Sequence, residues 1–264
     1  MTERSSALTY TTYLAVDELL ELQRPVSQGP EHDETLFIVI HQVYELWFKQ
    51  LLHEIDAVKE SFERGSGFDA YAKLKRISKI LEVLVKQIDV LITMTPLQFE
   101  TFRHRLDSAS GFQSGQFREL EAVLGRRDPR FGDHLAPQAR VRLNRRLEER
   151  SLWESMLVFV DRCGYAIPES VLERDFSTPY ESSPEVRQAL LRLHRENHEA
   201  MHLCEQLLDI DDLLREWRFR HVMMVERTIG TKSGTGGSAG SAYLMSTLNR
   251  NKSFPELWEI RAEF

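Results

Sequence analysis

The sequence is short of cysteine and has no long apolar run. Its two cysteines, Cys163 and Cys204, lie in unrelated contexts, which argues against a zinc ribbon, an iron–sulfur centre and a disulfide framework. No apolar signal core follows Met1, and no apolar stretch is long enough to span a bilayer. The formal net charge of −7 argues against a nucleic-acid partner, which would favour a basic surface. We therefore expect a soluble, cytoplasmic protein with neither a membrane span nor a nucleic-acid partner.

Helical periodicity is what the sequence does contain. Glycine and proline are sparse, and charges of both signs are mixed, as is typical of soluble helical proteins. Apolar spacing and end signals predict helices at about 10–23, 33–64, 68–92, 97–106, 112–124, 138–149, 152–162 and 184–229. The last segment fits either one bent helix or two. Strand-type alternation is essentially missing, and no repeat or long linker occurs, so we predict one all-α domain over residues 1–264, a large helical bundle.

His41 lies within a segment that is apolar on more than one face, as expected for a helix surrounded by other helices. Phe37 and Tyr44 are each about one helical turn away from it. A histidine in such surroundings is more often a satisfied core residue than a catalytic one. However, a neutral imidazole in an apolar pocket can also accept a hydrogen bond from a substrate N–H group.

His221 is flanked at helical spacing by Trp217, Met224 and Val225. Those surroundings suit a ligand to a flat apolar cofactor, and they suit a core residue equally well. The glycine-rich segment 234–238 follows, and its backbone N–H groups could contact an anion, although such runs are usually flexible loops. Thr235 adds a hydroxyl group to this segment, which favours a role of the segment in ligand binding.

Arg103 follows Phe99 and Phe102 on a short apolar helix. An arginine in this position either extends to the surface or binds an anion, and its planar guanidinium suits a carboxylate. The residues alone leave both alternatives open.

The segment His198-Glu199-Ala200-Met201-His202 matches the H-E-x-x-H pattern of zinc peptidases, and His194 extends the histidine stripe. This motif supplies an alternative from a different class of protein. The downstream sequence lacks the third histidine of the extended pattern, and the neighbouring residues resemble a solvated helix face. We therefore interpret the match as a chance one.

Several longer motifs, in order along nearly the whole chain, resemble those of the tryptophan 2,3-dioxygenases. They are His32-Asp33-Glu34-x-Leu36-Phe37-Ile38-x-x-His41-Gln42, Tyr44-Glu45-Leu46-Trp47-Phe48-Lys49, Phe102-Arg103, Ser110-Gly111-Phe112-Gln113-Ser114, Trp217-Arg218-Phe219-Arg220-His221 and Gly234-Thr235-Gly236-Gly237-Ser238. Tyr10-x-x-Tyr13-Leu14 and Phe254-Pro255-Glu256-Leu257 match the family at the two ends of the chain.

The resemblance implies an oxidoreductase of tryptophan catabolism that uses haem b. Such an enzyme cleaves the indole C2–C3 bond of L-tryptophan with O₂ to give N-formyl-L-kynurenine, the entry to the kynurenine pathway. It implies that His221 is the axial ligand of the haem iron and that the catalytic His41 hydrogen-bonds the indole N–H. Ser110 and Gly111 would contact the cofactor. The implied substrate-binding residues are Phe37 and Phe99 for the indole, Arg103 for the carboxylate, Thr235 for the head group, and Tyr10, Tyr13 and Leu14.

The resemblance also implies a homotetramer built as a dimer of dimers, in which residues 1–24 pack on a neighbouring subunit. Thr11 and Thr12 depart from the common pattern, and Phe99 stands where some bacterial members have tyrosine. One alternative is an enzyme that also uses haem but forms a different product. It is a biosynthetic homologue that acts as a monooxygenase, inserting a single oxygen into tryptophan or a methylated tryptophan. No residue of the sequence separates these two reactions.

Overall fold

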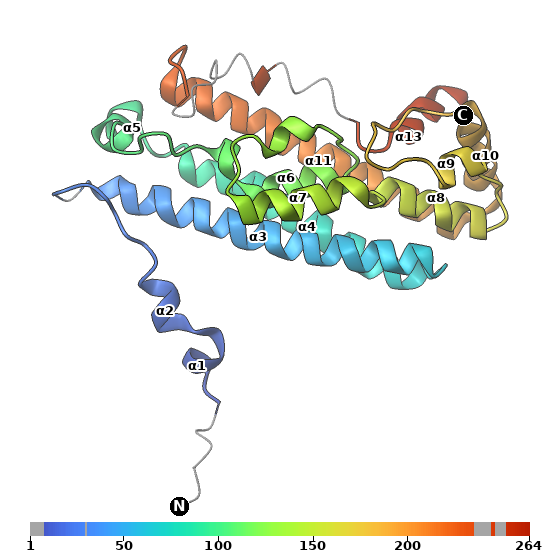
Figure 1. The fold of residues 1–264 in the computed structure, drawn as a ribbon, viewed down its shortest axis with the longest axis horizontal. Helices are drawn as coiled ribbons and strands as arrows, with labels where there is room; N and C mark the ends of the chain where they lie inside the picture. The colour runs from blue at the N-terminus through green and yellow to red at the C-terminus, as the bar shows by residue number, and fades with distance from the viewer. Residues whose placement is uncertain (1–7, 30, 235–243, 246–251) are drawn as a thin grey trace, which may run out of the picture.

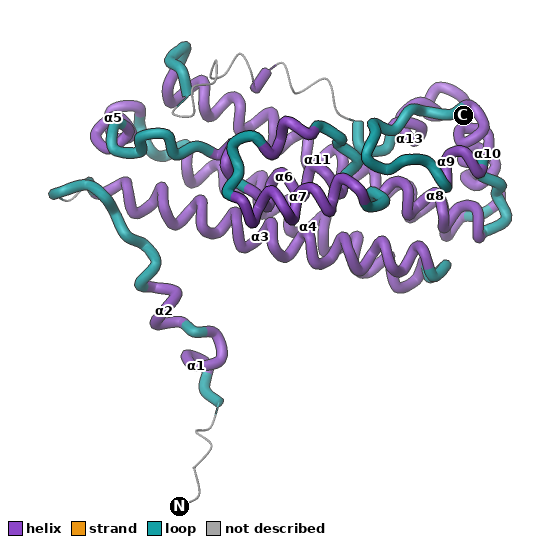
Figure 2. The backbone as a smooth tube through the Cα atoms, viewed as in Figure 1, coloured by secondary structure: helices purple, strands orange, loops and turns teal. Residues whose placement is uncertain are grey.

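The computed structural model describes residues 8–29, 31–234, 244–245 and 252–264. Helices and their connecting loops make up this part of the chain, and no strand occurs in it (Figure 2). The predicted all-α fold is therefore confirmed. None of the helices in these ranges is both long enough and apolar enough to cross a membrane.

Three long helices form the centre of the bundle (Figure 1): α3 (His32–Glu63), α4 (Gly67–Leu91) and α11 (His198–Ile229). Helix α4 packs along both α3 and α11. One face of α4 carries apolar residues at helical spacing that are almost completely buried, as Leu74 and Leu84 illustrate. Burial of this continuous apolar face is the main force that holds the bundle together.

Shorter helices cover the long ones. Helices α6 (Gly115–Val123) and α8 (Leu152–Arg162) pack on α3, and α7 (Pro137–Glu148) packs on α6. Helix α5 (Pro96–Arg103) lies at the opposite end of the bundle from α10 (Pro184–Glu196) and the C-terminus (Figure 1). The remaining elements are α9 (Glu169–Leu172), α13 (Pro255–Glu259), η1 (Gly111–Gln113), η2 (Pro129–Gly132) and η3 (Ile260–Glu263).

The segment 184–229 forms two helices, and the break between them lies at Asn197. Its backbone is extended, and its side chain accepts a hydrogen bond from the Ala200 N–H at 3.0 Å, which caps the start of α11. His194 therefore belongs to α10, whereas His198 and His202 belong to α11. The expected histidine stripe along one helix is wrong for this reason.

The N-terminal segment forms two short helices rather than the single one expected, α1 (Tyr10–Leu14) and α2 (Val16–Leu20). Ala15 between them adopts a left-handed backbone with φ of 50°. Neither helix buries a residue, and both project away from the bundle (Figure 1). The base of this arm is tied to α3, where the Gln23 side chain donates to Gln42 Oε1 at 2.6 Å.

Candidate functional site

A cavity of about 340 Å³ lies among α3, α5, α6 and α11. Its wall is largely apolar, and its volume falls in the range of small-molecule and cofactor sites. The predicted site residues that line it are Phe37, His41, Phe99, Arg103, Ser110, Gly111 and His221. The fold thus brings together residues that are widely separated in the sequence.

His221 faces this cavity from α11. The Trp217 ring, one turn earlier, stacks on its imidazole with centroids 5.5 Å apart and planes 15° from parallel. Burial lowers the pKa of His221 to about 4, and the nearby His41 adds to the effect. Among the described residues, none hydrogen-bonds its ring. His221 is consequently a neutral imidazole with a lone pair available to a ligand.

An aromatic cluster supports Trp217 and forms the wall beside His221. The Phe117 ring lies 5.3 Å from Trp217, and the rings of Tyr44 and Phe48 meet it edge-on at 6.0 and 6.3 Å. The Tyr44 hydroxyl donates to the Leu84 carbonyl at 2.9 Å, so this residue also links α3 to α4. These contacts hold the His221 side of the cavity rigid and apolar.

His41 faces the cavity from α3 and is not packed in the core, so the interpretation as a core residue is wrong. Its Nδ1 donates to the Phe37 carbonyl at 2.7 Å, and its ring lies 4.2 Å from the Phe37 ring. Burial lowers the pKa of His41, and the Phe37 hydrogen bond and Glu45 only partly oppose this. With the proton on Nδ1, the neutral ring presents the Nε2 lone pair as a hydrogen-bond acceptor.

Phenylalanine rings form the part of the cavity next to His41. The Phe37 ring lies 5.8 Å from Phe99, and both rings contact the completely buried Phe102, at 5.6 and 5.4 Å. Phe37 and Phe99 line the cavity, whereas Phe102 supports them from behind. The result is an apolar surface suited to a flat aromatic ligand.

Arg103 is the last residue of α5, and its side chain is 18 % exposed. Its Nη2 donates to the Ser233 carbonyl at 2.6 Å, and its Nη1 lies 3.9 Å from Glu100 Oε2. Ser233 and the cavity-lining Gly234 come directly before the predicted site residue Thr235, which lies outside the described residues. Arg103 therefore sits at the cavity beside the start of the glycine-rich segment, with donors suited to a carboxylate.

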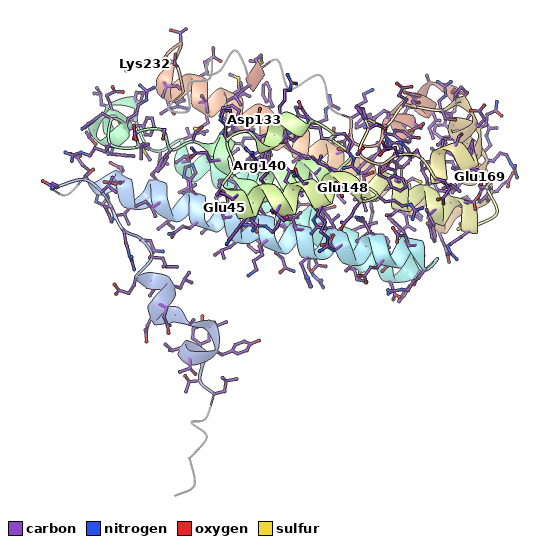
Figure 3. The ribbon with its side chains drawn as sticks, in the orientation of Figure 1. Glu45, Asp133, Arg140, Glu148, Glu169 and Lys232 are labelled. Atoms are coloured by element: carbon purple, nitrogen blue, oxygen red, sulfur yellow. The ribbon has the colours of Figure 1, made fainter. Side chains whose placement is uncertain are left out.

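Ser110 and Gly111 lie where the chain enters η1. The segment that follows is fastened to Glu45 (labelled in Figure 3) on α3, the helix on which α6 packs. Ser114 Oγ donates to Glu45 Oε1 at 2.5 Å, and the Gln116 side chain donates to Glu45 Oε2 at 2.8 Å. These bonds fix the 110–116 segment against the cavity.

Arginine side chains that the sequence did not single out also line the cavity: Arg118, Arg126 and Arg218, around Glu121. The only hint in the sequence is that Arg218 belongs to the motif that ends in His221. Arg118 and Arg126 come from α6 and the loop after it, and only the packed fold brings them to Arg218.

Two sets of sequence candidates lie away from this cavity. Tyr10, Tyr13 and Leu14 on the projecting arm are 76 %, 71 % and 45 % exposed, so any contact with substrate in another subunit stays a prediction. His198 and His202 of the zinc-peptidase motif are exposed on α11. Across the described ranges, no three side chains of histidine, cysteine, aspartate or glutamate are grouped to hold a metal ion.

Comparison with known proteins gives a consistent result. The family model described as tryptophan 2,3-dioxygenase matches residues 1–157 and 192–264. The tryptophan 2,3-dioxygenase of Herpetosiphon aurantiacus is 52 % identical over 260 residues, covering 98 % of this chain and 99 % of that protein. The tryptophan 2,3-dioxygenase of Anaeromyxobacter sp. (strain K) is 51 % identical, covering 97 % of this chain and 96 % of that protein. That of Caulobacter vibrioides is 45 % identical, covering 97 % of this chain and 98 % of that protein. The chain belongs to the tryptophan 2,3-dioxygenase family.

Proposed function

We propose that this chain is a haem-dependent dioxygenase that cleaves the indole C2–C3 bond of L-tryptophan with O₂ to give N-formyl-L-kynurenine. The observation that carries this proposal is the pair of neutral histidines, His41 and His221, that face one apolar cavity from different helices. Family membership supplies the substrate and the reaction class.

The described residues fit a haem. A histidine-ligated haem needs a neutral imidazole with an available lone pair and a flat apolar pocket next to it. His221 offers the first, and the rings of Phe48, Phe117 and Trp217 line the second. Haem b, when bound, supplies the redox-active iron that oxygen chemistry requires and that amino-acid side chains do not provide.

The side chains of this protein bind and orient the amino-acid substrate. His41 Nε2 accepts the indole N–H, because its Nδ1 proton is held by the Phe37 carbonyl. Phe37 and Phe99 contact the faces of the indole, and Arg103 binds the carboxylate through two N–H donors. Thr235 completes the set at the head group of the substrate. Contacts at both ends of the substrate restrict its motion and set the indole C2–C3 bond in one position.

We infer a homotetramer built as a dimer of dimers from the family resemblance, and the projecting arm supports packing between subunits. Leu8, Tyr10, Tyr13 and Leu20 on or beside α1 and α2 are between 66 % and 76 % exposed within one chain. Apolar side chains gathered on one segment gain stability when they are buried against a partner. We infer that residues 1–24 pack on a neighbouring subunit and bring Tyr10, Tyr13 and Leu14 to its cavity. A cytoplasmic location rests on the low cysteine content, and both cysteines are unpaired.

The reaction is tested by mass analysis of the product after the haem-loaded protein turns over L-tryptophan under ¹⁸O₂. A ring-opened product with two labelled oxygen atoms is expected. A product with an intact ring and one labelled oxygen would contradict the dioxygenase and support a monooxygenase. A parallel reaction with the haem-free chain measures the uncatalysed background.

A further inference from the structure

Glu34 binds two successive backbone N–H groups of the chain that precedes its helix. Its Oε1 accepts from the Val26 N–H at 2.7 Å, and its Oε2 accepts from the Ser27 N–H at 3.2 Å. Glu34 stands in the first turn of α3, where a glutamate side chain often caps its own helix. Here both oxygens bind another segment, and the residue is 2 % exposed. Glu34 is thus a buried acceptor that holds the backbone leading to the projecting arm.

Glu34 holds this backbone as a charged carboxylate. Burial by itself would raise the pKa of Glu34, but hydrogen bonds from Ser27 and Val26 and the charge of Arg105 lower it. Hydrogen bonds to a charged acceptor are stronger than those between neutral groups. Loss of the negative charge therefore weakens both of its backbone contacts.

Gln42, farther along α3, holds the other end of the same segment. Its side chain donates to the Leu22 carbonyl at 3.0 Å and accepts from the Gln23 side chain at 2.6 Å. We call residues 22–27 the arm base. Among the described residues, every hydrogen bond between residues 8–27 and the rest of the chain is made by Glu34 or Gln42. These two side chains are therefore the polar attachment of the arm to the bundle.

The arm base runs along α3 in the direction opposite to the helix. Its later residues contact Glu34, whereas its earlier residues contact Gln42. From Glu34 to Gln42 the helix rises about 12 Å, and an extended chain from Leu22 to Val26 spans about 13 Å. Gly29 has a φ of 108°, a conformation that favours glycine, where the chain reverses before α3. The matching lengths show that the two contacts fix both the position and the direction of the arm base.

The direction of the whole arm depends on this attachment. Helices α1 and α2 bury no residue, and they project from the bundle (Figure 1). A chain end without packing contacts is ordered only where it is tied down. Because Tyr10 and Tyr13 lie far from the arm base along the chain, a small rotation of the arm base moves their rings through a large distance.

We propose that Glu34 and Gln42 are positioning residues for the cavity of the neighbouring subunit. They hold the arm base against α3, so that the side chains of α1 enter that cavity in one orientation. This inference rests on the proposed function, since it requires residues 1–24 to pack on a neighbouring subunit. Gln42 follows His41 directly in the sequence. Helix α3 therefore serves two cavities, its own through His41 and that of the neighbour through the arm base.

The first test measures L-tryptophan binding to the haem-loaded, full-length protein by calorimetry, at a concentration where each variant sediments as the wild-type oligomer. Glu34→Gln replaces one acceptor oxygen with an NH₂ group, which cannot accept a backbone N–H. It should raise the dissociation constant roughly threefold to tenfold. Gln42→Met removes the hydrogen bonds at the other end of the arm base and should act in the same direction.

Glu60→Gln is the matched control, because Glu60 lies on the same helix, is 69 % exposed and pairs with Arg64. It should retain the dissociation constant of the wild type. Circular dichroism and the melting temperature report whether each variant folds. If Glu34→Gln does not fold, Gln42→Met decides the question.

A double-mutant cycle shows whether Glu34 acts through the arm. Tyr10→Ala and Tyr13→Ala together remove two rings of α1 that are 76 % and 71 % exposed within one chain. If Glu34 acts by aiming these rings, adding Glu34→Gln to this pair should weaken L-tryptophan binding by less than about twofold. A local effect of Glu34 on its own cavity would multiply the two losses and overturn the inference.

Mixed oligomers test whether the effect passes between subunits. Glu34→Gln and His41→Phe chains with different tags are co-expressed and purified through both tags. A Glu34→Gln subunit has an intact cavity and receives an arm with an intact base from a His41→Phe neighbour. The mixed oligomer should therefore contain tryptophan sites of wild-type affinity, which neither parent has.

The outcomes separate this inference from the proposed function. If the haem-loaded wild type does not bind L-tryptophan, or if the variant lacking both α1 rings binds it as tightly as the wild type does, the proposed function is wrong in that part. If the loss of these rings weakens binding but Glu34→Gln and Gln42→Met do not, the inference alone is overturned. The absence of wild-type sites in the mixed oligomer overturns it as well.

Discussion

Acid should destabilise the haem-free chain through His221. Histidine in the unfolded chain has a pKa near 6.5, whereas burial lowers the pKa of His221 in the fold to about 4. The unfolded state therefore binds the proton more readily, so destabilisation begins near pH 6.5, grows as the pH falls and is complete near pH 4. The difference between the two pKa values corresponds to roughly 3 kcal/mol of unfolding free energy, of which about 2 kcal/mol is lost between pH 7 and pH 5.

The assay is urea unfolding of the full-length haem-free chain at pH 7 and pH 5, followed by circular dichroism. His221→Phe keeps an aromatic ring and removes the titratable group, so all other acid effects are common to both proteins. The unfolding free energy of the wild type should fall by about 2 kcal/mol more than that of the variant. His202→Phe alters an exposed histidine of the same helix and should behave as the wild type does. Equal falls in the wild type and His221→Phe would refute the placement of His221 as a buried neutral group.

Three further substitutions test the remaining parts of the structure. Arg103→Met should raise the dissociation constant for L-tryptophan, measured by calorimetry, roughly tenfold or more. The dissociation constant for tryptamine, which lacks the carboxylate, should change little. Equal losses of affinity for the two ligands would contradict the binding of the carboxylate by Arg103. Because the pKa of His41 is lowered, L-tryptophan binding should stay constant at and above neutral pH and weaken in acid as His41 Nε2 becomes protonated. His41→Phe should bind more weakly without that acid dependence, and an unchanged pH profile would contradict the acceptor role. The side chain of Arg127 is 1 % exposed and donates hydrogen bonds to four main-chain carbonyls. Arg127→Met should therefore lower the unfolding free energy, measured by urea unfolding, by roughly 2 to 4 kcal/mol. The same substitution at Arg145, which is 80 % exposed on α7, should lower it by less than about 0.5 kcal/mol. Similar losses in both arginine variants would contradict the role of Arg127 in tying the chain together.

Helix positions were predictable where local signals are strong. The predicted helix 152–162 matches α8 because Ser151 and Glu154 form a capping box, and each side chain hydrogen-bonds the other's backbone N–H. The break at Asn197 was left open because apolar spacing continues on both sides of it, and only the extended backbone of Asn197 ends the first helix. The left-handed Ala15 was not predictable, since alanine carries no signal for that conformation.

The site was predictable only in part from the residues themselves. Helical periodicity places His41 and His221 on apolar faces, but a cavity wall and a packed core give the same pattern. The family resemblance supplied the roles that periodicity could not. Arg126 lies in a stretch that reads as a polar loop, and its place at the cavity depends on the ion pair with Glu121, five residues earlier on α6, which the pattern of a polar loop does not indicate.

Haem ligation by His221 is measured most directly by titrating haem into the full-length chain and recording the absorption spectrum. The wild type should develop the spectrum of a histidine-ligated haem at equimolar haem. His221→Ala should lose that spectrum, and added imidazole should restore it by occupying the space left by the side chain. If His221→Ala binds haem with the wild-type spectrum and affinity, His221 is not the iron ligand and the proposed site is wrong.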